Sequence, residues 1–287
     1  MSQPFEFKNY FELIKPRIAV LVLVTTFSGM WLGNGGMPDI RLTVFTLLGV
    51  ALAAGSSSIL NNLIDRNADQ LMTRTKDRSL ATGRVSPGVA LKLGLVLGIV
   101  AFTLLSVTVN WTTAFMALFS ILFYVFIYTL WLKRSTSLCT LVGGVAGALP
   151  PVMGFAAVDQ LGFPALVLFL ILFIWQPPHF WALAIVKKEE YRAAGFPMLP
   201  VVKGDRATQW QMLFYTIVLV PVTFIPYYME MAGMVYLAIA AVMGIIYLGW
   251  TIIFMNRPYS EKETYRLFYF SIFYLAVIYI TLFADHV

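Results

Sequence analysis

The chain has 287 residues, of which 60% are hydrophobic and 12% are charged, and its mean hydropathy is +0.80. Soluble globular domains average about 25% charged residues, so this composition excludes a soluble domain and indicates a polytopic membrane protein. The net charge of +6 is then explained by membrane topology and anion binding, and we expect no nucleic-acid partner.

Nine apolar segments are long enough to cross about 30 Å of hydrocarbon. They cover residues 18–34, 43–61, 89–108, 111–132, 138–158, 164–186, 212–229, 232–254 and 266–284. No low-complexity linker separates them. The sequence therefore predicts one all-α domain over residues 1–287, built as a bundle of nine transmembrane helices in the lipid bilayer.

The positive charges indicate the orientation of this bundle. Of the 20 Lys and Arg, only Arg41 falls on the opposite side from the others when the nine segments are threaded in order. By the positive-inside rule, the side that carries most Lys and Arg is cytoplasmic, so we expect the N-terminus inside and the C-terminus outside. The first apolar run lacks a cleavage pattern, and no transit sequence precedes it, which favours a bacterial inner membrane.

Three polar residues follow the second apolar segment at four-residue intervals: Asn61, Asp65 and Asp69. On a helix this spacing places them on one stripe that rises about 12 Å from first to last. Carboxylates at membrane depth are costly and usually functional, and paired oxygen ligands suit Mg²⁺ carrying a phosphorylated substrate. The stripe predicts a metal-bound diphosphate site.

Cations follow this stripe at Arg74, Lys76 and Arg78. A Mg²⁺-diphosphate needs such an arrangement, because the metal neutralises some oxygens and cationic side chains hold the others. The alternative is a set of solvated ion pairs at a helix end, worth about 0–1 kcal/mol each.

A second polar cluster surrounds His179, which lies in an apolar segment beside Pro177 and Pro178. Helical spacing directs His179 towards Lys187 and Glu190 on the cytoplasmic side. Metal ligand, proton carrier and structural residue are equally compatible with this position. The neighbouring Lys187-Lys188 pair fits either diphosphate binding or a positive-inside anchor.

Glycine and proline make the fifth apolar segment unusual. Gly143, Gly144 and Gly147 allow close backbone approach, and Pro150-Pro151 is expected to kink or break the helix beside a cavity. Tyrosines that line a cavity would stabilise a developing carbocation with their π-faces, whereas packing or an interfacial belt explains most tyrosines in such a chain. The candidates are Tyr124, Tyr128, Tyr227 and Tyr228.

The nine segments and the stripe of Asn61, Asp65 and Asp69 resemble the UbiA superfamily of intramembrane prenyltransferases. Further motifs, in order over roughly two thirds of the chain, resemble its heme O synthase family. They are Lys15-Pro16-Arg17, residues 61–78, Tyr128-Thr129, Leu132-Lys133-Arg134, and residues 143–151, 175–181, 190–195 and 197–200. Two positions depart from that family. Ser79 stands where proline is usual, which we expect to alter only loop stiffness, and Glu190 replaces a common aspartate.

The resemblance implies transfer of a farnesyl group from farnesyl diphosphate to a vinyl group of heme b, with addition of water, giving heme O and diphosphate. Asp65, Asp69 and Asn61 would hold the Mg²⁺ cofactor. The cations expected to stabilise the departing diphosphate are Arg74, Lys76, Arg78, Lys187 and Lys188. His179 would contact heme iron or a propionate. Further substrate-binding residues would be Tyr128, Trp175, Gln176, Glu190 and Tyr191.

Several alternatives stay open on the sequence. If the chain is another member of the superfamily, its acceptor is an aromatic acid or a chlorophyll-type tetrapyrrole instead of heme b. From other classes, a transporter would explain carboxylates in broken helices, and a heme-handling assembly factor would need His179 but neither Asp65 nor Asp69. A heme-modifying oxygenase or a terminal oxidase is a partner that the resemblance suggests.

Overall fold

A computed structural model describes residues 6–257 and 259–287, and these residues form helices and connecting turns. The helices are α1 Phe7–Leu13, α2 Pro16–Asn34, α3 Ile40–Asp69, α4 Pro87–Thr108, α5 Trp111–Leu122, η1 Phe123–Leu132, α6 Lys133–Ser135, α7 Cys139–Ala157, α8 Phe163–Val186, α9 Lys188–Ala193, α10 Leu199–Val222, α11 Ile225–Tyr228, α12 Met234–Asn256 and α13 Glu261–Ala284. The element η1 is a π-helix that continues α5.

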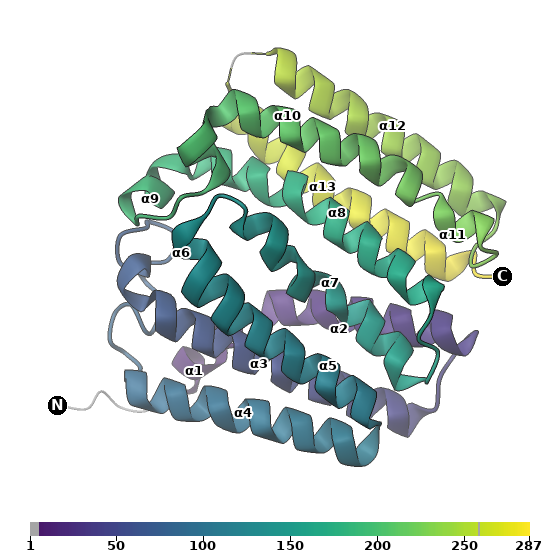
Figure 1. Cartoon of the computed structure of the whole chain (residues 1–287), viewed down its shortest axis with the longest axis horizontal. Coiled ribbons are helices and arrows are strands. Elements are labelled where there is room, and N and C mark those ends of the chain that lie inside the picture. Colours follow the sequence, from purple (N-terminus) through teal and green to yellow (C-terminus); the bar gives the residue numbers. More distant parts are fainter. Residues whose placement is uncertain (1–5, 258) are drawn as a thin grey trace.

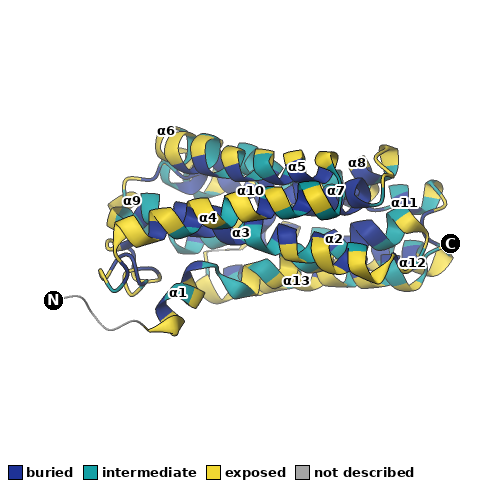
Figure 2. Cartoon of the chain, turned by 90° about the horizontal axis from the view of Figure 1, so that it is seen from below, coloured by how far each residue is buried: buried dark blue, intermediate teal, exposed yellow. Residues whose placement is uncertain are grey.

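The predicted bundle of nine membrane spans is confirmed. Within the described ranges, nine helical segments are long and apolar enough to cross a membrane. They lie side by side, with α6 and α9 at one end and α11 near the C-terminus at the other (Figure 1). Large apolar side chains on their outer faces are exposed, among them Ile99, Val107 and Ile245, as expected for contact with lipid (Figure 2).

Several helices extend beyond the predicted spans. The helix α3 runs on to Asp69 and so includes the whole polar stripe that was expected after residue 61. The helix α10 begins at Leu199, and Gly204 interrupts it with a φ of 80°. The helix α13 begins at Glu261, where the Ser260 hydroxyl accepts a hydrogen bond from the backbone N–H of Glu263. These turns are polar, so hydropathy alone did not reveal them.

The proline pairs do not end helices. Pro150-Pro151 lies inside α7 and Pro177-Pro178 lies inside α8, and each helix continues past its prolines. Of the predicted kink or break, the break is therefore wrong. The predicted close approach at glycine is confirmed, because a Cβ atom on Gly147 would lie 2.4 Å from Oε1 of Gln176.

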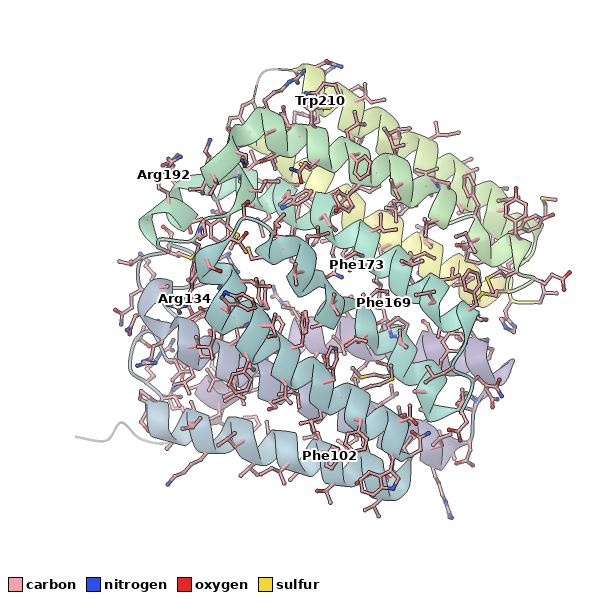
Figure 3. All side chains as sticks on the ribbon, in the orientation of Figure 1. Phe102, Arg134, Phe169, Phe173, Arg192 and Trp210 are labelled. Carbon is pink, nitrogen blue, oxygen red and sulfur yellow. The ribbon has the colours of Figure 1, made fainter. Side chains whose placement is uncertain are left out.

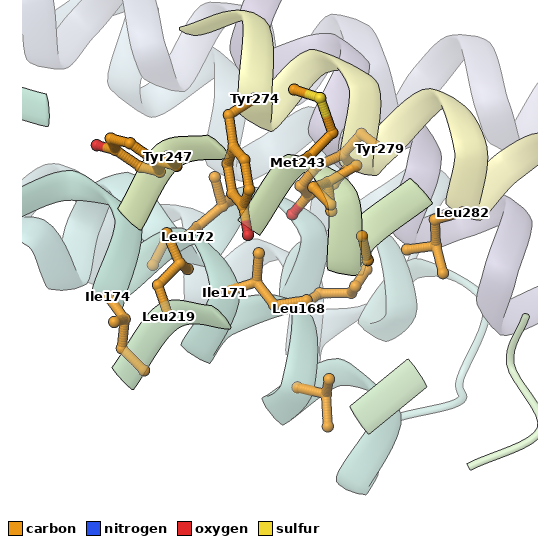
Figure 4. Packing of buried hydrophobic residues seen from close by; sticks show 14 of the residues in the cluster. Leu168, Ile171, Leu172, Ile174, Leu219, Met243, Tyr247, Tyr274, Tyr279 and Leu282 are labelled. Carbon is orange, nitrogen blue, oxygen red and sulfur yellow. The ribbon is translucent and has the colours of Figure 1, made fainter. Parts of the chain in front are cut away.

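The helix α7 lies between two groups of helices. A large apolar core joins α8, α10, α12 and α13, where Leu168, Ile171 and Tyr274 pack together (Figure 4). A second core joins α3, α4, α5 and α7 around Val50, Leu105 and Met153. The helix α7 contributes Ala148 and Phe155 to the first core and Leu149 and Met153 to the second, so it connects both groups.

Candidate active site

The last two turns of α3 bury the polar stripe. Asp65 is 1% exposed, and Asn61 and Asp69 are each 4% exposed. Burying two carboxylates is costly unless each is paired, and the surrounding helices supply the partners. Solvated ion pairs at a helix end are therefore excluded for Asp65 and Asp69.

Asp65 is paired with two cations from the segment that follows η1. Its Oδ2 accepts hydrogen bonds from Lys133 Nζ and, at 3.0 Å, from Asn61 Nδ2, while its Oδ1 lies 3.3 Å from Arg134 Nη2. Arg134 also donates to the carbonyl oxygen of Ile64. The η1–α6 junction thus fixes Asp65 from the side opposite to the loop after α3.

Asn61 joins three helices through its amide. Its Oδ1 accepts from Lys15 Nζ at 2.9 Å, and its Nδ2 donates to Asp65 and, at 3.1 Å, to Thr129 Oγ1. Thr129 in turn donates to the carbonyl oxygen of Tyr124, five residues earlier, so the π-helical turn orients its hydroxyl. This arrangement supports a hydrogen-bonding role for Asn61.

Lys15 precedes α2 in a left-handed backbone conformation with a φ of 51°. This conformation is uncommon for a residue with a side chain, and it lies at the candidate site. Burial, together with the nearby charges of Arg78 and Lys133, lowers the pKa of Lys15 from 10.5 to about 7. The carboxylates of Asp65 and Asp69 act in the opposite direction and raise the pKa of Lys15, so burial is the main reason that it falls.

Asp69 is paired with the loop that follows it. Arg78 Nη1 donates to Asp69 Oδ2 at 2.8 Å, and the Thr75 hydroxyl donates to the carbonyl oxygen of Asp69. Ser79 is fully buried, and its hydroxyl donates to Glu12 Oε2 at 2.8 Å. The expectation that Ser79 alters only loop stiffness is wrong, because its side chain attaches the loop to α1.

The second polar cluster meets the first through Glu190. Its Oε1 accepts from Lys187 Nζ at 3.1 Å, and its Oε2 lies 3.5 Å from the backbone nitrogen of Arg74. Lys133 lies 4.4 Å from the ring centroid of Phe196, which follows α9. Burial raises the pKa of Tyr191, and the nearby Arg74 guanidinium partly offsets this. The loops after α3 and α8 therefore form one surface.

The predicted cations do not all reach the stripe. Arg78 contacts Asp69, whereas Lys187 is paired with Glu190, and Lys188 with Asp205 at 3.0 Å. Lys76 is exposed. In Figure 3 Arg134 and Arg192 lie at the same end of the bundle as this site, and Arg192 forms an ion pair with Glu189.

Sequence reasoning assigned no site role to Lys15, Thr129, Lys133 or Arg134. All four lie in the short motifs that carried the family resemblance, next to Pro16 or within 128–134. Their contacts with α3 span 46 to 70 residues of sequence. No spacing rule along the chain predicts such contacts.

The donor set fits a magnesium ion that is shared with a substrate. Across the part of the chain that the structure describes, no group of three or more His, Cys, Asp and Glu side chains is placed to hold a metal on its own. Mg²⁺ commonly binds one or two protein carboxylates and completes its shell with water and substrate phosphate. The buried carboxylates of Asp65 and Asp69 match that chemistry.

A mostly apolar cavity lies beside this site, between α2, α3, α5, η1 and α7. Its polar lining residues are Lys15, Ser57, Ser58, Ser120 and Tyr124. Among the described lining residues Lys15 carries the one charge, and the same lysine bonds to Asn61. Lys15 therefore links the cavity to the polar stripe, and the rest of the lining is mostly apolar.

The candidate tyrosines divide between the two ends of the bundle. Tyr124 lines the cavity, and Tyr128 lies next to it with ring centroids 5.2 Å apart. Tyr227 and Tyr228 line a separate hollow with Gly233 and Val287 near the C-terminus. These two tyrosines therefore lie away from the cavity that Tyr124 lines.

His179 does not line this cavity. It lies between α8 and α13, stacked on Trp175 at 4.4 Å and on Phe268 at 4.5 Å between ring centroids. Its Nδ1 lies 2.7 Å from Ser271 Oγ, and that hydroxyl donates to the carbonyl oxygen of Phe268. Because Ser271 has one proton to donate, Nδ1 carries the imidazole proton and Nε2 keeps its lone pair.

The residues beside His179 are also held in place. Trp175 Nε1 donates to the carbonyl oxygen of Ser271 at 2.8 Å. Gln176 faces the other way, and its Nε2 donates to the carbonyl oxygen of Gly144 in α7. Since Gly147 lines the cavity and its Cα packs on Gln176, Gln176 lies directly behind the cavity wall.

This fold and site define a class of intramembrane transferase, and solved structures share the architecture. One, from work on digeranylgeranylglyceryl phosphate synthase in membranes, matches with a TM-score of 0.82 over 97% of each chain, at 18% identity. Another, a UbiA homolog from Archaeoglobus fulgidus bound to DMAPP and Mg²⁺, matches with a TM-score of 0.66 over 96% of this chain and 99% of that one, at 18% identity. At such identities the likeness establishes the fold.

The chain belongs to the UbiA prenyltransferase family, whose model matches residues 22–275. Similar curated proteins are the protoheme IX farnesyltransferases of Symbiobacterium thermophilum and Gloeobacter violaceus. They are 42% and 45% identical over 97% of this chain, and the matches cover 94% and 92% of their own lengths. The protoheme IX farnesyltransferase of Legionella pneumophila is 43% identical over 99% of this chain, and the match covers 96% of its own length.

Proposed function

We propose that this chain transfers the farnesyl group of farnesyl diphosphate to a vinyl group of heme b. The bond between C1 of the donor and its bridging oxygen breaks, and its electron pair leaves with the diphosphate. The vinyl group then attacks the allylic cation, and water adds to the resulting cation with loss of a proton. The products are heme O and diphosphate. The naming of relatives at 42–45% identity supports this reaction.

One observation carries the proposal: a buried carboxylate pair with cationic partners is joined through Asn61 and Lys15 to an apolar cavity. The cavity suits an isoprenoid chain, and the stripe suits its diphosphate. Arg78, Lys133 and Arg134 contact the carboxylates and lie where negative charge develops during departure. We also propose that Arg74 and Lys187, together with Glu190, Tyr191, Lys76 and Lys188, form the outer wall of the diphosphate site.

We infer that Asp65 and Asp69 hold Mg²⁺, with Asn61 positioning Asp65 by its hydrogen bond. The ion, when bound with the diphosphate, neutralises negative charge on the leaving group. Tyr124 faces the cavity beside Thr129, and its ring would stabilise the allylic cation, with Tyr128 behind it. The low-dielectric lining excludes water from that cation until the vinyl group has reacted.

His179 is our candidate for heme contact, with Trp175 and Gln176 as its neighbours. The hydrogen bonds of Ser271 leave Nε2 with a lone pair, which suits iron and cannot donate to a propionate. We expect His179→Ala to change the Soret band of bound heme b and to weaken heme binding at least about tenfold, a typical effect of losing a ligand. The control is His286→Ala, which changes a histidine outside the bundle. Equal heme spectra for both variants would assign His179 a packing role.

The cellular setting follows from the charges. We propose that the chain lies in the bacterial inner membrane with the polar site and N-terminus in the cytoplasm and the C-terminus outside. The loops that carry most Lys and Arg gather at the end with α6 and α9, which supports this orientation (Figure 1). The whole chain then works as one domain, with a heme-modifying oxygenase or terminal oxidase as its partner.

Purified chain in detergent or liposomes tests the proposal directly. With Mg²⁺, farnesyl diphosphate and heme b, we expect heme O and one diphosphate per turnover, and loss of both products with a chelator. An aromatic acid and a chlorophyll-type tetrapyrrole serve as competing acceptors. If either compound were prenylated in preference to heme b, heme b would not be the acceptor of this chain. Heme binding without diphosphate release would favour an assembly factor or transporter instead.

A further inference from the structure

The cavity beside Asn61 has a measurable depth along α3. Its lining on this helix runs from Ser58 and Ser57 through Ala54 and Ala53 to Val50. With a rise of 1.5 Å per residue, Val50 lies about 12 Å below Ser58 and about 16 Å below Asn61. A chain that begins at the diphosphate site therefore has about 12 to 16 Å of depth before it meets Val50.

This depth fits one class of isoprenoid. The main chain of a farnesyl group contains eleven carbon–carbon bonds, and at about 1.5 Å per bond its zigzag extends about 14 Å. The main chain of a geranylgeranyl group contains fifteen carbon–carbon bonds and extends about 19 Å, which exceeds the depth of the cavity. Chain length should therefore be limited by the residues at the bottom.

Beyond the deep lining residues Val22 on α2 and Met153 on α7, these two helices cross in close contact. A Cβ atom on Gly29 would lie 2.0 Å from the carbonyl oxygen of Pro151, and one on Gly154 would lie 2.1 Å from that of Thr26. At these glycines the two backbones touch. The cavity cannot lengthen here unless the helices separate.

Met153 is the adjustable side chain above this crossing. It is 3% exposed, lines the cavity, and directly precedes Gly154. Val22 and Val50 are the other deep lining residues, and both are short and β-branched. Methionine is long and has three rotatable bonds, so it fills the remaining space and defines where the cavity ends.

We propose that Met153 sets the longest prenyl donor that this chain accepts. The inference rests on the proposed function and deepens it by assigning donor selectivity to one residue. Met153→Ala removes three heavy atoms from the cavity floor and makes room for most of a fourth isoprene unit. Met153→Phe adds bulk at the same place and shortens the cavity.

The test compares kcat/KM for geranyl, farnesyl and geranylgeranyl diphosphate, with heme b as acceptor and mass spectrometry of the products. For Met153→Ala we expect the ratio of geranylgeranyl to farnesyl transfer to rise at least about tenfold, since one methylene in an apolar pocket already changes selectivity about 10- to 200-fold. Met153→Phe should shift the preference towards geranyl diphosphate.

The matched control is Leu149→Ala. Leu149 lies one turn earlier on α7, is 8% exposed and packs in the same core, but it does not line the cavity. It should lose stability like Met153→Ala and keep the wild-type donor ratios. Unchanged ratios in both Met153 variants, with farnesyl transfer intact, would overturn the role of Met153 alone. Wild-type chain that transfers no prenyl group to heme b would instead overturn the proposed function.

Discussion

The variant Asp65→Asn is expected to lose prenyl transfer by at least about 10²- to 10³-fold, the usual effect of removing one group that stabilises charge in the transition state. Asparagine keeps the size of the side chain and removes the charge that would bind Mg²⁺. It also leaves Lys133 and Arg134 without their carboxylate partner. Diphosphate release from farnesyl diphosphate, measured at saturating heme b, gives the loss in turnover.

Stability must be separated from catalysis in this variant. Removing one partner of a buried ion pair costs about 3–5 kcal/mol, so the melting temperature will fall. Heme binding reports whether the remaining protein is folded, and we expect it to be retained. Asp77→Asn is the control, because Asp77 is an exposed carboxylate in the neighbouring loop. Full activity of folded Asp65→Asn would refute the metal role.

Gly154→Ala and Gly29→Ala are expected to cause the largest losses of stability. Each new methyl group would meet a backbone oxygen at 2.1 or 2.0 Å, and a backbone cannot move aside as a side chain can. Overpacking costs about 1–3 kcal/mol and occasionally more, so we expect a clearly lower melting temperature or failure to fold. Thermal unfolding of the detergent-purified chain measures this effect.

Gly249→Ala supplies the matched control for this pair. Gly249 also lies within a long membrane helix, α12, but a Cβ atom there would have no neighbour within 4 Å. Alanine favours helix over glycine by about 0.8–1.0 kcal/mol, so this variant should match or exceed wild-type stability. If the melting temperature of Gly154→Ala equals that of Gly249→Ala, the contact between α2 and α7 contributes little to stability.

Hydropathy and charge placement determined the membrane fold. The nine spans and the stripe of Asn61, Asp65 and Asp69 follow from local hydropathy and spacing, because each depends on residues within one helix. The gathering of Lys and Arg at one end then follows from threading the nine spans in order. Family motifs then implied the reaction, and similar proteins support it.

Tertiary packing decided which residues surround the stripe. Lys15, Thr129, Lys133 and Arg134 reach α3 because α2 and η1 pack beside it, and such contacts between distant segments leave no periodic signal. The same packing turned His179 towards α13, away from the cavity. The sequence by itself determined which faces of the helices are polar or apolar. Only the tertiary structure determined which of those faces meet, because side-chain fit between helices is not encoded in any single segment.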